Sequence, residues 1–377
     1  MHIIMSRIYI ILTILVFSFI SCNNRKPTVS EVSSLPCTTV EINIEPEFYD
    51  SVAEKMDKPR FVVISEDDNT MFAEICRVID RNDKYFILDR YDARTVVSFT
   101  HDGKPYASYG RTGNGPGEYV FPLDIDVRDS TVYILDSSSK KLIIYSEHGT
   151  YIGEKPVPFF ADAFKVTDNG DYLFNLAPGN EYQTCVADSS LGDLQYRLKY
   201  DPKYKGGWGT NDIIREYPDG AIYYLAPRDT LYILDGDGVP VKGMVFDFLG
   251  KGLPEIAKED YIAADRNGAT DNKLRLINSP MLLSNGLWLG LAEDGENDYS
   301  ILFDPENNRS GARKFDKSSS VYDMIWPSGI DHNGNPITLL NMTIAERCHD
   351  YDDLPSEIKD ALENAKPVLL IHNISGK

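Results

Sequence analysis

A four-strand pattern that returns along the chain is the feature that most restricts its fold. The segment 83–119 reads as three short strands, YFILD, TVVSF and PYASYG, separated by turn residues and followed by a glycine-rich loop. YFILD at 85–89 matches VYILD at 132–136, and TVVSFTHDG at 95–103 matches KLIIYSEHG at 141–149, at offsets of 47 and 46 residues. Each copy follows a further alternating run, AEICRVID or LDIDVR, so the repeating unit has four strands.

Weaker copies of the unit continue to the C-terminus. They cover residues 163–198, 213–248, 281–316 and 323–343, and PVLLIHNI at 367–374 completes the last one. Five units and a split sixth, spaced by roughly 40–65 residues, predict an all-β fold, a six-bladed β-propeller of four-stranded blades. A pair of β-sandwiches or a β-solenoid is the alternative.

The two ends of such a propeller are expected to pair, because an open sheet edge exposes unpaired backbone groups. We expect the strand at 368–374 to pair with an N-terminal strand near 39–44, and 60–65 is a further strand candidate. Two short helical insertions are predicted at 253–264 and 355–365 from a leading proline and early acidic residues. These helices either pack on the outside of the propeller or cover a central pocket.

The first 21 residues are typical of an export signal. A largely apolar run at 8–20 follows Arg7, and it is too short to cross a bilayer. Ser21 then precedes Cys22, which resembles the lipobox of bacterial lipoproteins, although Phe19 departs from the usual leucine. We expect a signal peptide at 1–21, lipidation of Cys22, a tether at 22–36 and the propeller at 37–377. A buried first helix or a membrane span is the alternative for the apolar run.

The charge of the chain argues against one class of partner. With 58 acidic and 38 basic residues the formal net charge is −20, whereas nucleic-acid binding needs a basic path for phosphates. The residues after Cys22 are Asn-Asn-Arg-Lys and lack the acidic patch that resembles a surface-export signal in Bacteroidetes, so a periplasm-facing location is favoured. The remaining cysteines are widely spaced and predict no disulfide framework: Cys37, Cys76, Cys185 and Cys348.

The loop GRTGNGPGEY at 110–119 is the most distinctive segment. Four glycines and a proline allow positive φ angles and tight turns, which favours a structural crossover between blades: Gly110, Gly113, Gly115, Gly117 and Pro116. In a second hypothesis Arg111, Glu118 and Tyr119 bind a ligand at the propeller mouth, where Arg111 and Glu118 could also pair. The loop is no phosphate loop, because it lacks the Lys-Ser/Thr ending and no helix follows.

This loop with its continuation, GRTGNGPGEYVFPLDIDV, together with DTLYIL at 229–234 and the terminal AKPVLLIHNI, carries a family resemblance. It resembles the six-bladed β-propeller lipoproteins of Bacteroides and related bacteria, which are distantly similar to NHL-repeat propellers. The resemblance covers about residues 36–377. It implies the propeller fold and a place in the cell envelope, and it implies no activity and no set of catalytic residues.

Motifs with known chemistry are sparse. Asp235-Gly236-Asp237-Gly238 resembles a calcium loop but lacks the later ligands, so a hairpin turn is predicted there. His101 and His148 are interpreted as surface residues in equivalent turns of neighbouring units. His332 has no metal-ligand spacing with the Cys348-His349 pair, and neither G-x-S-x-G nor H-E-x-x-H occurs.

The sequence therefore favours a binding or scaffolding protein over an enzyme. It would be held on a membrane by its lipid and would recognise a glycan, a peptide or an envelope protein as a monomer. No catalytic residue or metal ligand is predicted, and a divalent cation such as Ca²⁺ is the cofactor left open. The alternative is a metal-dependent lactonase or hydrolase with acidic ligands at the propeller mouth. Trp208 and Trp326 would stack on a ligand or fill the spaces between blades.

Overall fold

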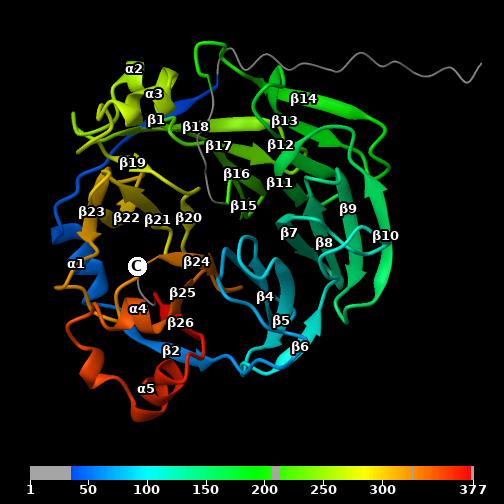
Figure 1. Ribbon diagram of the computed structural model, residues 1–377. Helices are drawn as coiled ribbons and strands as arrows, with labels where there is room; N and C mark the ends of the chain where they lie inside the picture. The colour runs from blue at the N-terminus through cyan, green and yellow to red at the C-terminus, as the bar shows by residue number, and fades with distance from the viewer. Residues whose placement is uncertain (1–34, 206–211, 325, 375–377) are drawn as a thin grey trace, which may run out of the picture.

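A ring of six β-sheets around one axis forms the body of the protein (Figure 1). The computed structural model describes residues 35–205, 212–324 and 326–374, and these residues contain 26 strands. The predicted six-bladed β-propeller is confirmed. The predicted signal peptide, Cys22 and Trp208 lie outside the described residues.

Blades 1 to 3 are each one continuous run of chain with antiparallel neighbours. Blade 1 contains β3 (Arg77–Arg81), β4 (Lys84–Asp89), β5 (Thr95–Thr100) and β6 (Pro105–Ser108). Blade 2 contains β7 (Pro122–Arg128), β8 (Thr131–Asp136), β9 (Lys141–Ser146) and β10 (Tyr151–Pro156). Blade 3 contains β11 (Ala161–Val166), β12 (Tyr172–Leu176), β13 (Tyr182–Ala187) and β14 (Leu194–Lys199). The first strand of each blade lies nearest the axis (Figure 1).

Blades 4 to 6 depart from this plan. Blade 4 contains β15 (Ile214–Tyr217), β16 (Gly220–Tyr224), β17 (Thr230–Asp235) and β18 (Pro240–Asp247), with β1 (Cys37–Glu41) added at its outer edge. Blade 5 has a divided inner strand, β19 (Arg275–Leu276) and β20 (Met281–Leu282), followed by β21 (Trp288–Glu293), β22 (Asp298–Asp304) and β23 (Arg309–Lys314). Blade 6 contains β24 (Pro327–Ile330), β25 (Pro336–Leu340), β26 (Val368–Asn373) and, outermost, β2 (Asp57–Val63).

The ring is closed in blade 6 by a different strand from the one we expected. β26 pairs antiparallel with β2, with Val63 opposite Val368. The predicted partner at 39–44 is wrong, because that part of the chain forms β1, which pairs in parallel with β18 of blade 4. Val62 packs toward blade 1 while Phe61 and Val63 pack on the other side of the sheet, so β2 has apolar side chains for both faces of a blade. β1 buries only Val40 fully, which suits an outer rim.

The segment 37–63 runs along the outer edges of blades 4, 5 and 6, and its trace follows the left side of Figure 1. After β1, the backbone N–H of Asn43 donates to the Ser310 hydroxyl at 2.7 Å, and the N–H of Ala312 donates to the carbonyl of Glu45 at 3.2 Å. Helix α1 (Glu47–Ala53) then packs against β23. One N-terminal segment thus covers three neighbouring blade edges that would otherwise present unpaired backbone groups.

Both predicted helical regions are helical. The first is divided at Asp260 into α2 (Glu255–Glu259) and α3 (Tyr261–Arg266), because the Asp260 side chain caps α3 by accepting the Ala263 N–H at 3.2 Å. The second is α5 (Ser356–Glu363), whose apolar residues pack on blade 6. Helices α1 and α4 (Met342–Ala345) and the 3₁₀ turn Tyr351–Asp353 are additions that were not predicted, since each is too short to show an apolar period. None of the described helices lines the central pocket.

Apolar clusters fill the spaces between neighbouring blades. The cluster between blades 1 and 2 contains Phe86 and Leu88 from β4, Ile125 from β7 and Ile134 from β8, all fully buried. The strands therefore need apolar residues on both faces, which explains near-continuous apolar runs such as YFILD. Among the described cysteines the thiols are free, and burial raises the pKa of Cys185 to about 12.

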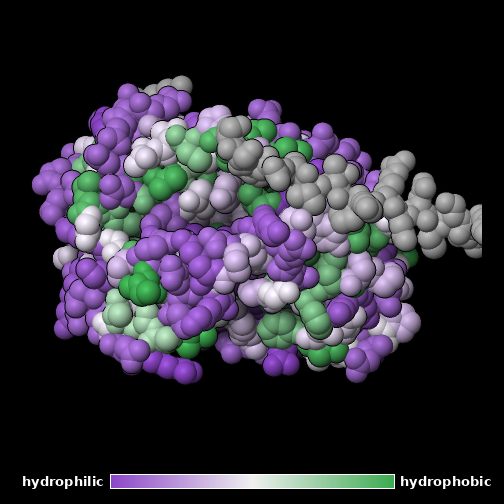
Figure 2. Space-filling model, turned by 90° about the horizontal axis from the view of Figure 1, so that it is seen from above, coloured by the Kyte–Doolittle hydropathy of each residue, from purple (hydrophilic) through white to green (hydrophobic). Residues whose placement is uncertain are grey.

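The face seen in Figure 2 is covered largely by hydrophilic residues, and the apolar ones occur in separate small groups. This distribution agrees with the acidic composition of the chain. In the part of the chain that the structure describes, no helix has the length and apolar character needed to cross a bilayer.

Candidate functional site

A cavity of about 530 Å³ lies on the propeller axis, where the inner strands of the six blades face one another. Its size is within the range of small-molecule binding sites. Blades 5 and 6 supply a largely apolar wall of Met281, Leu282, Leu283 and Ile330. Blades 2, 3 and 4 supply a charged wall of Asp126, Lys165, Arg215 and Glu216. The cavity is therefore amphipathic.

One end of the cavity is closed by a buried network of charges. Arg77 of β3 contacts Asp124 of β7 at 2.5 Å and lies 3.8 Å from Asp212, which also pairs with Arg215 at 2.7 Å. All four side chains are about nine-tenths buried or more. Burial alone would lower the pKa of the Arg77 guanidinium, but Asp124 and Asp212 raise it above its ordinary value. Burial also raises the pKa of the Asp124 carboxyl and lowers that of the Arg215 guanidinium, so each of these charges depends on its partner. The four paired side chains form a polar floor.

Two alternate aspartates of β7 attach blade 2 to blade 3. Asp124 accepts the backbone N–H of Phe164 at 2.9 Å, and Asp126 accepts that of Val166 at 2.7 Å. The side chain of Lys165, between these two residues, comes within 3.9 Å of Asp126. Because carboxylates that accept backbone N–H groups hold their positions firmly, this part of the wall is preorganised.

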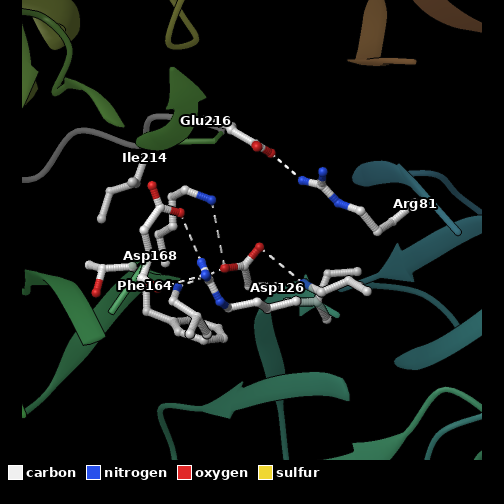
Figure 3. Close-up of polar contacts among 12 residues, drawn as sticks. Arg81, Asp126, Phe164, Asp168, Ile214 and Glu216 are labelled. Atoms are coloured by element: carbon white, nitrogen blue, oxygen red, sulfur yellow. Dashed lines mark hydrogen bonds and ion pairs between the residues drawn. The ribbon is translucent and has the colours of Figure 1, made fainter. Parts of the chain in front are cut away.

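The other end of the cavity is the open one. Arg81 of β3 and Glu216 of β15 come from opposite blades and form an ion pair across the axis; Figure 3 shows them pointing at each other. Their side chains are 34% and 55% exposed, in contrast to the buried floor. The axial cavity is thus a pocket that is closed near Arg77 and opens near Arg81.

A group of three side chains lies beside this mouth and joins blade 1 to blade 6. Asp80, at the end of β3, contacts Nε2 of His101 at 2.6 Å through one carboxylate oxygen and Nδ1 of His332 at 2.9 Å through the other. The two imidazole rings are parallel, with centroids 5.9 Å apart. The hydrogen bond to Asp80 raises the pKa of His332 above its ordinary value. Asp80 and His332 border both the axial pocket and a second cavity beside it.

The loop at 110–119 lies away from these cavities and is closed on itself. Arg111 and Glu118 do pair, at 2.7 Å, and the second carboxylate oxygen of Glu118 accepts the N–H of Gly115 at 2.9 Å. Gly110 has φ of +76°, and a Cβ there would lie 2.6 Å from the Tyr145 hydroxyl, so glycine is required. Tyr119 is fully buried between blades 1 and 2. Its internal contacts and its required glycine are those of a structural crossover between blades. Ligand binding by Arg111 and Glu118 stays a prediction.

Two other sequence features can be placed. The predicted hairpin turn at 235–238 is present, and Asp235 accepts the N–H groups of Asp237 and Val239 at 3.0 and 2.9 Å. The interpretation of His101 and His148 as equivalent surface residues is wrong. Lys84 pairs with Thr100 and Thr131 pairs with Ser146, so His101 corresponds to Glu147, one position before His148. Only His148 is a surface residue, with 70% of its side chain exposed, whereas His101 is 27% exposed.

The sequence did not reveal the Asp80, His101 and His332 group, since 252 residues separate Asp80 from His332. The three residues meet because β3 and β24 are adjacent inner strands of the first and last blades. A partial signal was available: Asp80 is an acidic residue at a strand position whose equivalent in blade 2 is the apolar Val127. Trp326, named as a ligand-stacking candidate, is 37% exposed and does not line the axial pocket.

Comparison with known proteins establishes the family. Residues 41–373 match the family model described as "Domain of unknown function (DUF4934)". The chain belongs to the DUF4934 family. A search of curated proteins finds no match to this sequence.

Solved structures show what this DUF4934 fold is similar to. A Bacteroides fragilis NCTC 9343 protein described as exported superposes with a TM-score of 0.72 at 16% identity, covering 90% of this chain and 100% of that chain. A member of the duf4221 family from Bacteroides vulgatus superposes with a TM-score of 0.51 at 11% identity, covering 85% of this chain and 98% of that chain. At these identities the likeness concerns the fold alone.

Proposed function

We propose that this DUF4934 protein is a non-catalytic binding lipoprotein of the cell envelope that takes a short peptide, carboxylate end first, into its axial pocket. The observation that carries the proposal is the pocket itself, closed at one end by ion pairs and amphipathic along its walls. The protein would be anchored through Cys22 and would face the periplasm as a monomer. The distant resemblance to NHL-repeat propellers agrees with a binding role but does not indicate which ligand is bound.

The envelope location rests on the N-terminal residues. The apolar run at 8–20 and Ser21-Cys22 resemble a lipoprotein signal, and the polar residues 23–36 would serve as a tether to the membrane. The similar protein of Bacteroides fragilis is described as exported. Both observations support a protein that acts outside the cytoplasm.

The charged wall suggests which end of a peptide enters. The Lys165 ammonium faces the axis from β11 with one ion-pair contact among the described residues, to Asp126 at 3.9 Å, so it has donors left for another carboxylate. The guanidinium groups of Arg77 and Arg215 are held by Asp124 and Asp212 in shorter contacts. Lys165 is therefore the group best placed to receive a peptide carboxylate.

The opposite wall suits apolar side chains. Blades 3 and 6 face each other across a six-bladed ring, so Ile330 of β24 lies across the axis from Lys165, with Leu282 beside it on blade 5. Sugars are usually held by aromatic platforms, and Tyr217 is the aromatic residue among the described residues lining the pocket. A peptide with an apolar side chain matches this wall better than a glycan does.

The proposal is tested with a panel of tetrapeptides, each prepared with a free and with an amidated C-terminus, and isothermal titration calorimetry. Free-acid peptides with apolar C-terminal residues should bind. Lys165→Gln should weaken that binding roughly 10–100-fold, because a hydrogen bond to a charged group contributes about 1.5–3 kcal/mol. Amidated peptides should bind wild type and Lys165→Gln equally weakly.

Lys199→Gln is the matched control. Lys199 lies on β14, the outer strand of the same blade, where its side chain is 65% exposed and pairs with Glu181. This variant should bind as wild type does. Equal affinity for free and amidated peptides, or binding of oligosaccharides in place of peptides, would contradict the proposal.

The alternative function, a metal-dependent lactonase or hydrolase, has one observation in its favour, the Asp80, His101 and His332 group at the pocket mouth. Its predicted acidic ligands on the axis find less support. The described carboxylates Asp124, Asp126 and Asp212 are each engaged by arginine, lysine or backbone N–H groups. Turnover of lactones or esters by the metal-loaded protein would favour this alternative.

A further inference from the structure

We propose that Asp80, His101 and His332 form a zinc-binding site at the mouth of the axial pocket, with the open coordination position facing the cavities. This inference goes beyond the proposed peptide binding and is independent of it. Each residue offers one ligand atom, and these atoms all lie within 4.8 Å of one another.

The distances fit a small ion with tetrahedral preference. Zn–N and Zn–O bonds of about 2.0–2.1 Å place neighbouring ligand atoms roughly 3.3 Å apart. The contacts of Asp80 with His101 and His332, at 2.6 and 2.9 Å, are shorter than this, and the widest separation within the group is below 4.8 Å. To admit the ion, the contact of Asp80 with His101 would lengthen by about 0.7 Å and that with His332 by about 0.4 Å, while the widest pair of ligand atoms would move closer together.

The charge balance of Asp80 points to a cation. Its side chain is 1% exposed, and a buried carboxylate needs a positive partner. In residues 35–205, 212–324 and 326–374, its ion-pair partners are the two histidines, and no lysine or arginine pairs with it. By contrast, Asp124 and Asp212 at the pocket floor each pair with arginine.

Surrounding groups hold the two imidazole rings in place. His101 packs on the ring of Tyr85, with centroids 4.7 Å apart, and its carbonyl accepts a hydrogen bond from Arg60 at 3.3 Å. The side-chain amide of Asn333 lies 3.0 Å from Nε2 of His332. In the structure the Asn333 Nδ2 faces this nitrogen and donates to it, which puts the imidazole proton on Nδ1. Turning the amide by 180° would present its oxygen to Nε2 and leave Nδ1 free for a metal.

The donor set selects the metal and its mode of binding. Two imidazoles and one carboxylate suit zinc, whereas Ca²⁺ takes six to eight oxygen ligands. Three protein ligands leave a fourth position for water or a bound molecule, as in zinc sites that exchange ligands. Because Asp80 and His332 border both cavities, this position is accessible from the pocket mouth.

The test is calorimetric titration of the metal-stripped chain starting at Asn23, which contains every described residue, with Zn²⁺ alone. Wild type should bind one Zn²⁺, and Co²⁺ in its place should give the intense visible absorption of four-coordinate cobalt. His332→Ala should weaken Zn²⁺ binding by at least about 100-fold, since loss of a ligand exceeds the 10–100-fold effect of an outer partner such as Asn333. Ca²⁺ should not bind.

His148→Ala is the matched control, because His148 lies in the corresponding turn of blade 2, is 70% exposed and belongs to no group of three potential metal ligands among the described residues. It should bind Zn²⁺ as wild type does. Asp80→Asn, checked for folding by circular dichroism, tests the carboxylate separately. Absence of Zn²⁺ binding by wild type, or unchanged affinity in His332→Ala, would overturn the proposal and leave peptide binding untouched.

Discussion

Individual buried polar residues divide into two kinds in this propeller. Arg77 and Asp124 are buried with their charges matched, so they fix the pocket floor. His372 of β26 is fully buried and has no charged partner among the described residues. Its ring forms one hydrogen bond there, between Nε2 and the Thr338 hydroxyl at 3.1 Å. Burial therefore lowers the pKa of His372 to about 4.

We predict that His372 makes the fold less stable in acid. Its pKa falls from 6.5 in the unfolded chain to about 4 in the folded protein, so the unfolded chain takes up the proton first as the pH drops below 6.5. Between pH 6.5 and about 5 this lowers the free energy of unfolding by about 2 kcal/mol. Urea unfolding at about pH 7.5 and about pH 5 measures this change. The free energy of unfolding should fall by correspondingly less in His372→Gln than in wild type.

The exposed His148 provides the comparison for this experiment, since 70% of its side chain is accessible. His148→Ala should keep the pH dependence of wild type. Parallel pH profiles of wild type and His372→Gln would show that His372 is not the group responsible.

At the scale of elements, the N-terminal segment acts as a cover for sheet edges. β1 adds to β18 in parallel, with Val40 opposite Phe246, and the chain then follows blades 5 and 6. Val40 is fully buried in the cluster between blades 4 and 5, whereas its neighbour Thr39 is exposed. The attachment of this segment therefore depends on Val40, on Ile42 just after the strand, which is buried in the same cluster, and on the ladder hydrogen bonds.

We predict that Val40→Ala lowers the free energy of unfolding by about 2 kcal/mol, because two buried carbon atoms are lost and a cavity remains. Chemical denaturation measures this change. Thr39→Ala on the same strand should change it by no more than about 0.5 kcal/mol. Equal effects of the two substitutions would mean that β1 is not packed on blade 4 in solution.

At the scale of the whole molecule, closure depends on residues from both ends of the chain. β26 lies between β25 and β2 in blade 6, so it carries hydrogen bonds to a C-terminal and an N-terminal strand. Its apolar residues Leu369 and Ile371 also fill the space beside blade 1. Blade 6 is thus the joint on which the ring depends.

We predict that a chain ending at Pro367 loses cooperative folding, because removal of β26 separates β2 from β25 and opens the ring. Circular dichroism melting should show no sharp transition, and size-exclusion chromatography should show aggregates from the exposed edges. A chain ending at Ile374, which keeps every described strand, should melt as wild type does. A sharp transition in the shorter chain would show that the ring closes without β26.

Local pattern was enough to predict much of the architecture. YFILD and VYILD became second strands, and both helical regions are present. The pairing of Arg111 with Glu118 was also anticipated, since seven residues separate them. These features depend on turn-forming residues and on the alternation of apolar residues, and both can be recognised from residues that are close in the sequence.

The sequence by itself thus determined the repeat, the number of blades and the family-like loop. Only the tertiary structure decided which N-terminal strand closes the ring, that β1 joins blade 4, and that Asp80, His101 and His332 meet at the pocket mouth. The physical reason is distance along the chain. A propeller places its first and last blades side by side and lines a common axis with one strand from every blade. The site therefore consists of residues that are far apart in the sequence and that no local pattern connects.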